Sequence, residues 1–423
     1  MRLKKIKVVW ICHFSDKIIR RHIKFDKFYY KTIIKRILFR KISGWLDYAV
    51  WNSNAIKEFE KFDDIDLTII FPHAGIKGKT QEFSLNGINF ICFRSEDDNL
   101  GSFIKSRMTK SIRNNYPKNR ELIIELISKI KPDIVHVIGA ENPYYSMAAL
   151  DIPQNIPSIV SLQTLISDPD FKRNYPIGEE QYKILSFIES RIIKRSDYIA
   201  TRVQLFQEII KNSIKPKAKF LNISLAVGQD VDKSYLEKKY DFVYFAANVS
   251  KAGDYAIEAF ALARYQMPGI TLNMSGFCSP EFKATLDKRI NELGISDCVF
   301  ITGPQSTHDD VLRQIKKSRF AILPLKIDLV SSTIREAMAC GLPVVTTITP
   351  ATPHLNRDRE SILISEKGDF QAMANNMIRL LKDEELACRL RENGIKTVQE
   401  RYSNERNMEE WRKSYYDIVG IKQ

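Results

Sequence analysis

The feature that most restricts the fold of this 423-residue chain is its alternation of short β-rich runs with helical patterns. Such alternation is typical of parallel sheets whose strands are connected by helices. A polar stretch at residues 228–239 interrupts the rhythm, which then resumes, so two such sheets are predicted. The predicted strands cover residues 6–12, 67–72, 88–93, 133–138 and 158–163 before the interruption, and 241–247, 270–276, 298–303, 320–325, 343–347 and 361–366 after it.

The predicted domain boundaries follow from this interruption. We expect an N-terminal domain over residues 1–222, a linker over 223–240 and a C-terminal domain over 241–405. Residues 406–423 have the pattern of a final helix that can cross back to the N-terminal domain. The predicted fold class is α/β, with two Rossmann-like, doubly wound domains facing across a cleft. In this architecture ligands bind at the carboxyl ends of the strands.

The composition is that of a soluble globular protein, with 44% apolar and 27% charged residues. Six cysteines are scattered singly, which argues against a disulfide framework or a structural zinc site. No apolar run in the sequence approaches the roughly 20 residues that span a bilayer. We therefore expect a cytoplasmic protein that is not integral to a membrane.

The net charge of +14 is concentrated near the N-terminus. The segment Lys17–Lys41 carries ten lysines or arginines and one acid, Asp26. Threaded on a helix, it places cations on one face and isoleucines with Tyr30 on the other. An anionic membrane surface attracts such a segment, which would hold the protein at the inner face of the membrane. A solvated helix packed on its own domain is an equally good interpretation. No nucleic-acid-reading module accompanies the charge, so nucleic acid is not an expected partner.

The most informative segment is IDLVSSTIREAMACGLPVVTT, at residues 327–347. Asp328 follows a predicted strand, Glu336 lies eight residues later near a predicted helix start, and Gly341 with Pro343 ends that helix. A helix N-terminus after a parallel strand offers free N–H groups to a phosphate. A carboxylate one turn into the helix can accept hydrogen bonds from both ribose hydroxyls, and a second acid can reach sugar hydroxyls. This combination suits a nucleotide sugar. The hydroxyl side chains at the helix start are Ser331, Ser332 and Thr333.

EAMACGLPVV, preceded by an acid eight residues before its glutamate, resembles the donor motif of the retaining GT-B glycosyltransferases of family 4, the glycosyl transferases group 1. The resemblance implies that Glu336 binds the ribose of a nucleotide-sugar donor. It also implies that Asp328, in place of a second glutamate, contacts the sugar. Leu329 and Val330 replace the family's Phe-Gly, which implies a hexose pocket of different shape.

Other stretches resemble the family in the same order along the chain. FAANVSKAGDYAIEAFALA is similar to the segment in which an arginine and a lysine neutralise the donor pyrophosphate. Lys251 matches the lysine and Asn248 stands near the arginine position. LNMSGF resembles a strand end of the family that carries a glycine, here Gly276. Arg202, after a predicted apolar strand, is expected either to face the donor phosphates or to cap a helix. The predicted donor-binding residues are Glu336, Lys251, Asn248, Ser331, Ser332, Thr333, Gly276 and Arg202.

KPDIVHVIG resembles the acceptor-domain strand of the same family. Glu141 follows this strand and is predicted, with Asp328, to be catalytic. His13, at the end of the first predicted strand, and His136 are predicted to contact the acceptor. A lone histidine within an apolar strand, such as His136, is more often a satisfied core residue.

Simpler interpretations of the same residues remain open. Thr333 and Glu336 also fit an S/T-x-x-E capping box, in which Glu336 would only satisfy a backbone N–H. Asp328 alone fits a solvated loop acid, and Lys251 alone fits a surface lysine. Two Asp-x-Asp patterns lack neighbours that would complete an oxygen cage, so no essential metal is expected. No cofactor is expected either, because the nucleotide sugar, linked to UDP or GDP, is a co-substrate.

The predicted function is retaining transfer of a sugar from a nucleotide-sugar donor to a saccharide or lipid-linked saccharide, in surface polysaccharide assembly. Lys251 and the helix start near Thr333 would stabilise charge on the departing diphosphate. The competing prediction is a non-catalytic GT-B relative that binds a saccharide or partners an active subunit. A third prediction keeps the fold but changes the reaction to that of a sugar-nucleotide epimerase or a phosphorylase.

Overall fold

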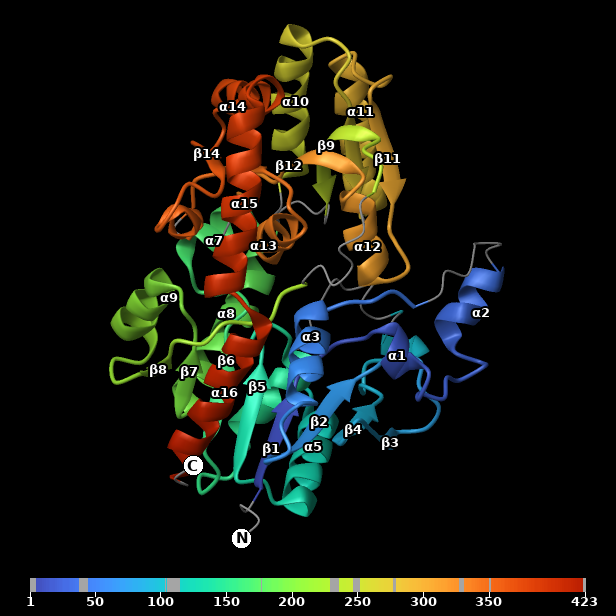
Figure 1. Cartoon of the computed structure of the whole chain (residues 1–423). Coiled ribbons are helices and arrows are strands. Elements are labelled where there is room, and N and C mark those ends of the chain that lie inside the picture. Colours follow the sequence, from blue (N-terminus) through green and yellow to red (C-terminus); the bar gives the residue numbers. More distant parts are fainter. Residues whose placement is uncertain are drawn as a thin grey trace. The chain divides into compact units, whose positions relative to one another are not determined.

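The computed structural model describes residues 5–37, 45–102, 104, 115–175, 177–228, 236–245, 252–276, 279–326, 331–349 and 351–420. The predictions for Asn248, Lys251 and Asp328 lie outside these residues. The chain divides into two compact units, of which the first comprises residues 1–172, 177–226 and 404–423 (Figure 1). The second comprises residues 173–176 and 227–403. The last helix of the chain therefore belongs to the unit that contains the first strand.

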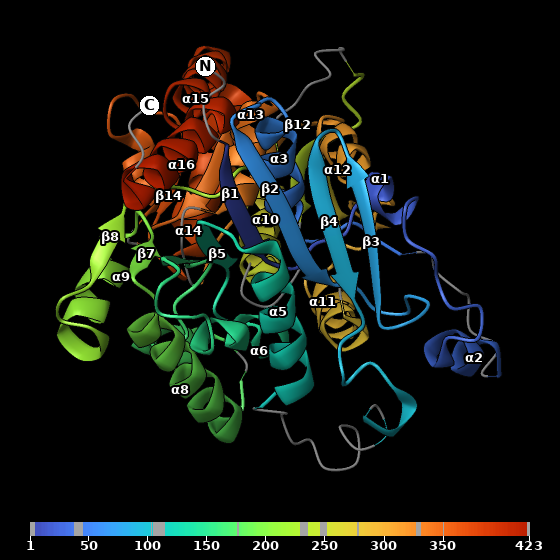
Figure 2. The same cartoon turned by 90° about the horizontal axis from the view of Figure 1, so that it is seen from below.

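The first unit is built on an eight-stranded sheet in the order β3-β4-β2-β1-β5-β6-β7-β8. Figure 2 shows the sequence from β3 to β5, and β6 is labelled in Figure 1. All neighbouring pairs are parallel except β3 with β4. The five predicted strands are present, and β3, β7 and β8 are additional. Chain order reverses its direction across the sheet between β1 and β5, which is where ligands bind to doubly wound sheets. The strands are β1 (Ile6–Ile11), β2 (Ile65–Pro72), β3 (Thr80–Leu85), β4 (Ile88–Phe93), β5 (Ile134–Ile138), β6 (Ser158–Ser161), β7 (Tyr198–Ala200) and β8 (Lys219–Leu221).

Helices cover both faces of this sheet. On one face Trp10 of β1 packs edge-on against Phe59 of α3 and Trp411 of α16, with ring centroids 4.7 and 5.4 Å apart. Figures 1 and 2 show α5 on the opposite face. The helices and turns of the unit are α1 (Lys17–Arg20), α2 (Tyr30–Ile37), α3 (Val50–Phe59), α5 (Pro117–Ile130), α6 (Pro143–Ser146), η1 (Met147–Leu150), α8 (Glu179–Arg195), α9 (Gln204–Ile209), η2 (Ile210–Ile214) and α16 (Asn404–Val419). The helix α7 (Pro169–Asn174) begins in this unit, and its last two residues are assigned to the second.

The basic segment Lys17–Lys41 does not form the single helix that was predicted, because tertiary hydrogen bonds draw residues 21–29 out of helical geometry. The Lys24 carbonyl accepts from the Lys77 N–H and from the Gln81 amide, and Phe25 forms an isolated β-bridge with Ile76. The apolar residues Ile19 and Ile23 are buried, as the amphipathic pattern implies. Residues 38–41 of the predicted helix lie outside the described part of the chain.

The second unit is built on a six-stranded parallel sheet in the order β11-β10-β9-β12-β13-β14. All six strands were predicted. Chain order proceeds outward from β9 on one side and from β12 on the other, so the switch point lies between β9 and β12. The strands are β9 (Tyr240–Phe245), β10 (Leu272–Ser275), β11 (Val299–Gly303), β12 (Ser318–Ile322), β13 (Val344–Thr347) and β14 (Leu363–Ser365).

The helices of the second unit surround this sheet and share one apolar core with it. Four of the strands are completely or almost completely buried, which fits their continuous apolar runs. The helices are α10 (Gly253–Gln266), α11 (Pro280–Glu292), α12 (His308–Ile315), α13 (Ser332–Ala339), η4 (Thr352–Asn356), α14 (Phe370–Lys382) and α15 (Glu384–Arg401).

Candidate functional site

The predicted donor motif lies where β12 leads into α13, beside the switch point of the second sheet. Ser331 is the N-cap residue of α13, and its hydroxyl lies 2.6 Å from the Thr333 hydroxyl. Both side chains are buried, whereas Ser332 between them is half-buried. The local sequence therefore places two hydroxyl groups and the start of an eight-residue helix at the carboxyl edge of the sheet.

Glu336 is the fifth residue of α13, and only 6% of it is exposed. Its Oε1 atom accepts a hydrogen bond from the Gly228 N–H at 3.3 Å and lies 3.3 Å from His308 Nε2. Because the helix begins at Ser332, Glu336 is two positions beyond the third helical position that a capping box uses. The contacts of this carboxylate are thus with residues 28 and 108 positions away rather than with its own helix start.

Gly228 approaches this pair so closely that a side chain at this position would have to displace one of them. A Cβ atom at position 228 would lie 2.9 Å from Glu336 Oε1 and closer still to His308 Nε2. Real Cβ atoms do not come this near to their neighbours, so any larger residue would displace the carboxylate or the imidazole. The present positions of Glu336 and His308 therefore depend on a glycine at position 228.

The electrostatic surroundings keep Glu336 charged. Burial alone would raise the pKa of its carboxyl group, but the nearby His308 imidazole, the Gly228 N–H and the Arg335 guanidinium outweigh burial and lower the pKa. A carboxylate that stays ionised while buried is a strong hydrogen-bond acceptor. This group can therefore accept hydrogen bonds from a neutral polar ligand such as a diol.

Sequence reasoning missed both partners of Glu336. His308 is the first residue of α12, whose N-cap residue Thr307 accepts a hydrogen bond from the Asp310 N–H. Gly228 lies in the polar stretch that was interpreted only as a linker. The glycine was a visible signal, but nothing in the sequence pairs either residue with α13, because the contacts arise from the tertiary fold.

A neighbouring strand end carries one more predicted donor residue, Gly276. Gly276 directly follows β10, has a φ of +117° that favours glycine, and donates its N–H to the Gly303 carbonyl at 3.0 Å. Lys326, between β12 and α13, is a cation that the prediction did not include. Its Nζ atom lies 2.5 Å from Asp254 Oδ2 and 4.8 Å from the centre of the Tyr255 ring.

A second group of predicted residues lies in the first unit, at the carboxyl ends of β1 and β5. His13 Nδ1 lies 3.2 Å from the Tyr145 hydroxyl, which donates to the Ile138 carbonyl at 2.9 Å. Gly139 follows β5 with a φ of +99°, and a Cβ there would lie 2.5 Å from the Tyr145 hydroxyl and 2.7 Å from Glu141 Oε1. The structure therefore brings His13 and Glu141 together around Gly139 and Tyr145.

Glu141 is the more unusual member of this group. Burial raises the pKa of its carboxyl group to about 7, whereas burial lowers the pKa of His13 to about 4. Oε1 accepts from the Asn142 amide at 3.1 Å, and Oε2 is buried with no hydrogen-bond partner among the described residues. A carboxyl group with these properties can gain or lose a proton near neutral pH.

His136 and Arg202, in contrast, have structural partners. His136 is fully buried in β5, with Nδ1 2.7 Å from the Tyr415 hydroxyl and Nε2 2.7 Å from the Ser161 hydroxyl. Burial lowers the pKa of His136 to about 3, so the ring is neutral. Arg202 lies in the first unit, donates to the Asn222 carbonyl at 2.8 Å and pairs with Glu410 of α16. These contacts are those of a core histidine and of a helix-binding arginine.

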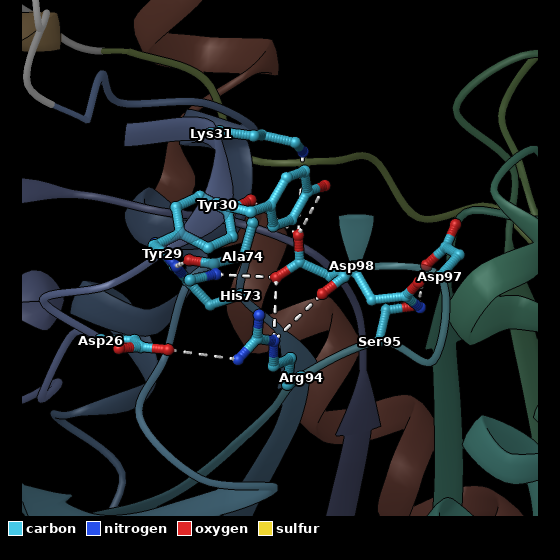
Figure 3. Close-up of polar contacts among 12 residues, drawn as sticks. Asp26, Tyr29, Tyr30, Lys31, His73, Ala74, Arg94, Ser95, Asp97 and Asp98 are labelled. Atoms are coloured by element: carbon cyan, nitrogen blue, oxygen red, sulfur yellow. Dashed lines mark hydrogen bonds and ion pairs between the residues drawn. The ribbon is translucent and has the colours of Figure 1, made fainter. Parts of the chain in front are cut away.

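A polar cluster around Asp98 holds the start of α2 against the sheet of the first unit (Figure 3). The buried Asp98 carboxylate accepts from the Tyr29 hydroxyl at 2.6 Å and from the Gly75 N–H at 2.8 Å. Arg94 Nε lies 3.4 Å and Lys31 Nζ 3.7 Å from the same carboxylate. This cluster anchors one side of the basic segment and leaves its other side at the surface.

The exposed side of the basic segment combines cations with apolar groups. Phe28 is 80% exposed, which is unusual for a phenylalanine in a globular protein, and Ile18 is 51% exposed. The exposed cations of the same segment are Lys17, Arg21, Lys24, Lys27 and Lys31. None of the described helices is long and apolar enough to cross a bilayer. Within the described residues, no three histidine, cysteine or acidic side chains are grouped as metal ligands.

Comparison with known proteins agrees with this arrangement. Residues 229–397 match the family model described as Glycosyl transferases group 1. The chain is 24% identical over 258 residues to the N-acetyl-alpha-D-glucosaminyl L-malate synthase of Bacillus anthracis. This alignment covers 61% of the chain and 66% of the length of that relative.

Solved structures share the fold over nearly the whole chain. The sucrose-phosphate synthase from Thermosynechococcus elongatus superimposes with a TM-score of 0.71 at 15% identity and covers 99% of this chain and 100% of its own. An E. coli structure described as trehalose-6-phosphate bound with UDP-2-fluoro glucose superimposes with a TM-score of 0.66 at 11% identity, over 97% and 98% of the two chains. The protein thus has the predicted GT-B fold of two Rossmann-like α/β domains.

Proposed function

We propose that this protein is a glycosyltransferase that takes its sugar from a nucleotide-sugar donor bound at the second unit. The observation that carries the proposal is the buried, ionised Glu336 carboxylate beside the switch point of the second sheet. Its position in a segment that matches the glycosyl transferases group 1 model supports the same conclusion. The Bacillus relative is named as a glucosaminyl malate synthase, which is consistent with sugar transfer.

The proposed donor chemistry uses charge rather than a covalent intermediate. Glu336 accepts hydrogen bonds from the two ribose hydroxyls of the nucleotide, and the N–H groups at the start of α13 face its phosphates. Lys251, which matches the family's phosphate-binding lysine, neutralises the diphosphate as it departs, and Asp328 contacts the sugar. The resemblance to retaining enzymes makes retention of the anomeric configuration part of the proposal.

Nucleotide binding is the first test. We expect calorimetry to detect binding of UDP or GDP and the substitution Glu336→Gln to weaken it at least tenfold, because a charged acceptor contributes about 1.5–3 kcal/mol. Glu281→Gln, which changes an exposed acid of α11, is the matched control and should bind like the wild type. Failure of the wild-type protein to bind either nucleotide would favour a non-catalytic relative.

Transfer itself requires a second measurement. A panel of radiolabelled nucleotide sugars is incubated with the protein and a membrane extract, and nucleotide release and labelled product are measured. Labelled product from one donor supports the transferase. Release of an isomerised donor without an acceptor would indicate an epimerase instead, and no turnover of any donor would rule out catalysis.

We propose that the acceptor binds the first unit near Glu141 and His13. The Glu141 carboxyl group, with its pKa near 7, is suited to interact with an acceptor hydroxyl, and the neutral His13 ring can bind a sugar by stacking and hydrogen bonding. Glu141→Gln should lower the transfer rate without weakening UDP or GDP binding. Equal loss of both properties would contradict a role on the acceptor side.

The exposed basic segment suggests that the acceptor is lipid-linked and belongs to surface polysaccharide assembly. Lysines around an exposed phenylalanine fit an anionic bilayer surface, where each cation contributes about 1 kcal/mol. The protein should therefore co-sediment with vesicles of phosphatidylcholine and phosphatidylglycerol but not with phosphatidylcholine alone. Phe28→Ser should reduce this binding, whereas Phe187→Ser, which changes a 63% exposed phenylalanine of α8, should not. Equal binding to both vesicle types would remove the proposal.

A further inference from the structure

We propose that His308 is a positioning residue, which holds the Glu336 carboxylate in place for the ribose of a nucleoside diphosphate. This inference rests on the proposed nucleotide binding at Glu336. It assigns a role in that binding to a residue of α12. This helix follows β11, the edge strand three positions from β12 in the sheet.

The geometry places three separate parts of the second unit around one oxygen atom. His308 Nε2 comes from the first residue of α12, the Gly228 N–H from the segment before β9, and Glu336 Oε1 from α13. The Gly228 N–H donates to Oε1 at 3.3 Å, and His308 Nε2 lies at the same distance from that oxygen. A glutamate side chain has three rotatable bonds, so neighbours on two sides of one oxygen restrict the direction in which the other oxygen points.

The packing around the imidazole supports a defined position rather than a loose contact. Only the absence of a side chain at Gly228 makes room for the ring next to the carboxylate. The His308 side chain is 16% exposed and that of Glu336 is 8% exposed. An interaction shielded from water to this degree is stronger than the same pair at the surface.

A purely structural role explains the arrangement less well. A buried contact between polar groups contributes little net stability, because the desolvation of both groups offsets their attraction. Aliphatic residues of similar volume would fill this space at lower cost. A binding site has a different requirement, since it must present a charged acceptor that is already oriented before the ligand arrives.

The matched substitutions His308→Gln and His308→Met separate the effect of a hydrogen-bond donor at position 308 from the effect of side-chain shape. The glutamine Nε2 group can occupy the place of the imidazole Nε2 and donate to Glu336, whereas methionine has nearly the same shape but no donor. We measure the dissociation constants of UDP and GDP, and of their 2′,3′-dideoxy analogues, by calorimetry. His354→Met, which changes an exposed histidine of the same unit, is the control substitution.

We expect His308→Met to weaken UDP or GDP binding about tenfold, the effect of one hydrogen bond to a charged group. His308→Gln should remain within about threefold of the wild type. The dideoxy analogues should bind the wild type and His308→Met equally, because they lack the hydroxyls that Glu336 accepts. Equal binding of the dideoxy analogues would show that His308 acts by positioning Glu336, because a variant with a damaged fold would bind all of these ligands more weakly.

Two results would overturn the inference alone. One is unchanged UDP and GDP binding by His308→Met, and the other is an equal loss for the dideoxy analogues. A wild-type protein that binds neither nucleotide would overturn the proposed function itself, and that result is visible before any variant is made.

Discussion

Arg412 and Asp64, 348 positions apart in the sequence, form a bidentate ion pair within the first unit. Arg412 Nε lies 3.0 Å from Oδ1, and Nη2 contacts Oδ2 of the same carboxylate. The Tyr416 hydroxyl donates to Oδ2 at 2.8 Å. Helix α16 is thereby tied to the turn that precedes β2.

We expect Arg412→Gln to lower the free energy of unfolding by about 1–3 kcal/mol, because it removes charged hydrogen bonds from a carboxylate that is largely shielded from water. Burial alone would raise the pKa of Asp64, but Arg412 and Tyr416 outweigh it and lower the pKa. The ion pair therefore stabilises the fold above the unfolded pKa of about 4, and this contribution is lost as the pH falls through the folded pKa. Urea unfolding at pH 7 and pH 3.5 should show the difference between the proteins shrinking at the lower pH. Arg406→Gln, on the exposed side of the same helix, should have little effect at either pH.

Tyr415 joins two buried nitrogen atoms of the same unit. Its hydroxyl lies 2.9 Å from Trp10 Nε1 and 2.7 Å from His136 Nδ1. We expect Tyr415→Phe to destabilise the protein by about 2–4 kcal/mol, because both nitrogens would stay buried without that partner. Thermal unfolding measures the change, with Tyr265→Phe at an 88% exposed position as the control. A loss below about 0.5 kcal/mol would show that water or a rearrangement replaces the hydroxyl.

Gly228→Ala should abolish or strongly weaken nucleotide binding while leaving the sheet intact. The added methyl group would push Glu336 or His308 away from its present position. We expect at least a tenfold weaker association with UDP or GDP, measured by calorimetry. The control is Gly178→Ala, where the φ is −64° and a Cβ would meet no atom within 4 Å. Wild-type affinity in Gly228→Ala would mean that the site tolerates displacement of the carboxylate.

Glu141→Gln should make the protein more stable at alkaline pH. The folded pKa of Glu141, about 7, exceeds the ordinary value of 4.5 because of burial. The folded state therefore holds its proton more tightly than the unfolded state, and the wild type loses stability as the pH rises from about 4.5 to 7. Glutamine cannot ionise, so the variant should be more stable by about 1–3 kcal/mol at pH 8 and by much less at pH 5. Urea unfolding tests this, with the exposed Glu125→Gln as the control, and parallel pH profiles for wild type and Glu141→Gln would contradict it.

The strands were predictable because fully buried parallel strands are continuous apolar runs, and most of the predicted ones occur within two residues of their expected bounds. The strand β3 was not predicted, because its polar, partly exposed residues do not form a continuous apolar run. Its turn, Asn86–Gly87, has positive φ at both positions, as tight hairpins require. That Asn-Gly pair was the available indication of a hairpin.

The candidate site likewise contains residues that the sequence could point to and residues that only the tertiary structure reveals. Glu336 could be identified because its motif is local, with the helix start and stop within one segment. His308 and Gly228 could not be identified, because residue spacing does not indicate contacts between residues 28 or 108 positions apart. For the basic segment Lys17–Lys41, the sequence predicted a single helix that the structure does not contain. Its helical pattern is real, but hydrogen bonds from Lys77 and Gln81 override it.

The assignment of α16 to the first unit has a consequence for synthesis of the chain on the ribosome. Trp10 and His136 emerge early, yet the residue that hydrogen-bonds both, Tyr415, follows 405 and 279 positions later. At roughly 5–20 residues per second, many seconds pass before α16 can pack on Trp10 and His136. The second unit, which is nearly continuous in sequence, is complete before the first. The apolar contacts that α16 makes with the first sheet, such as that between Trp411 and Trp10, can therefore form only when the whole chain has been synthesised.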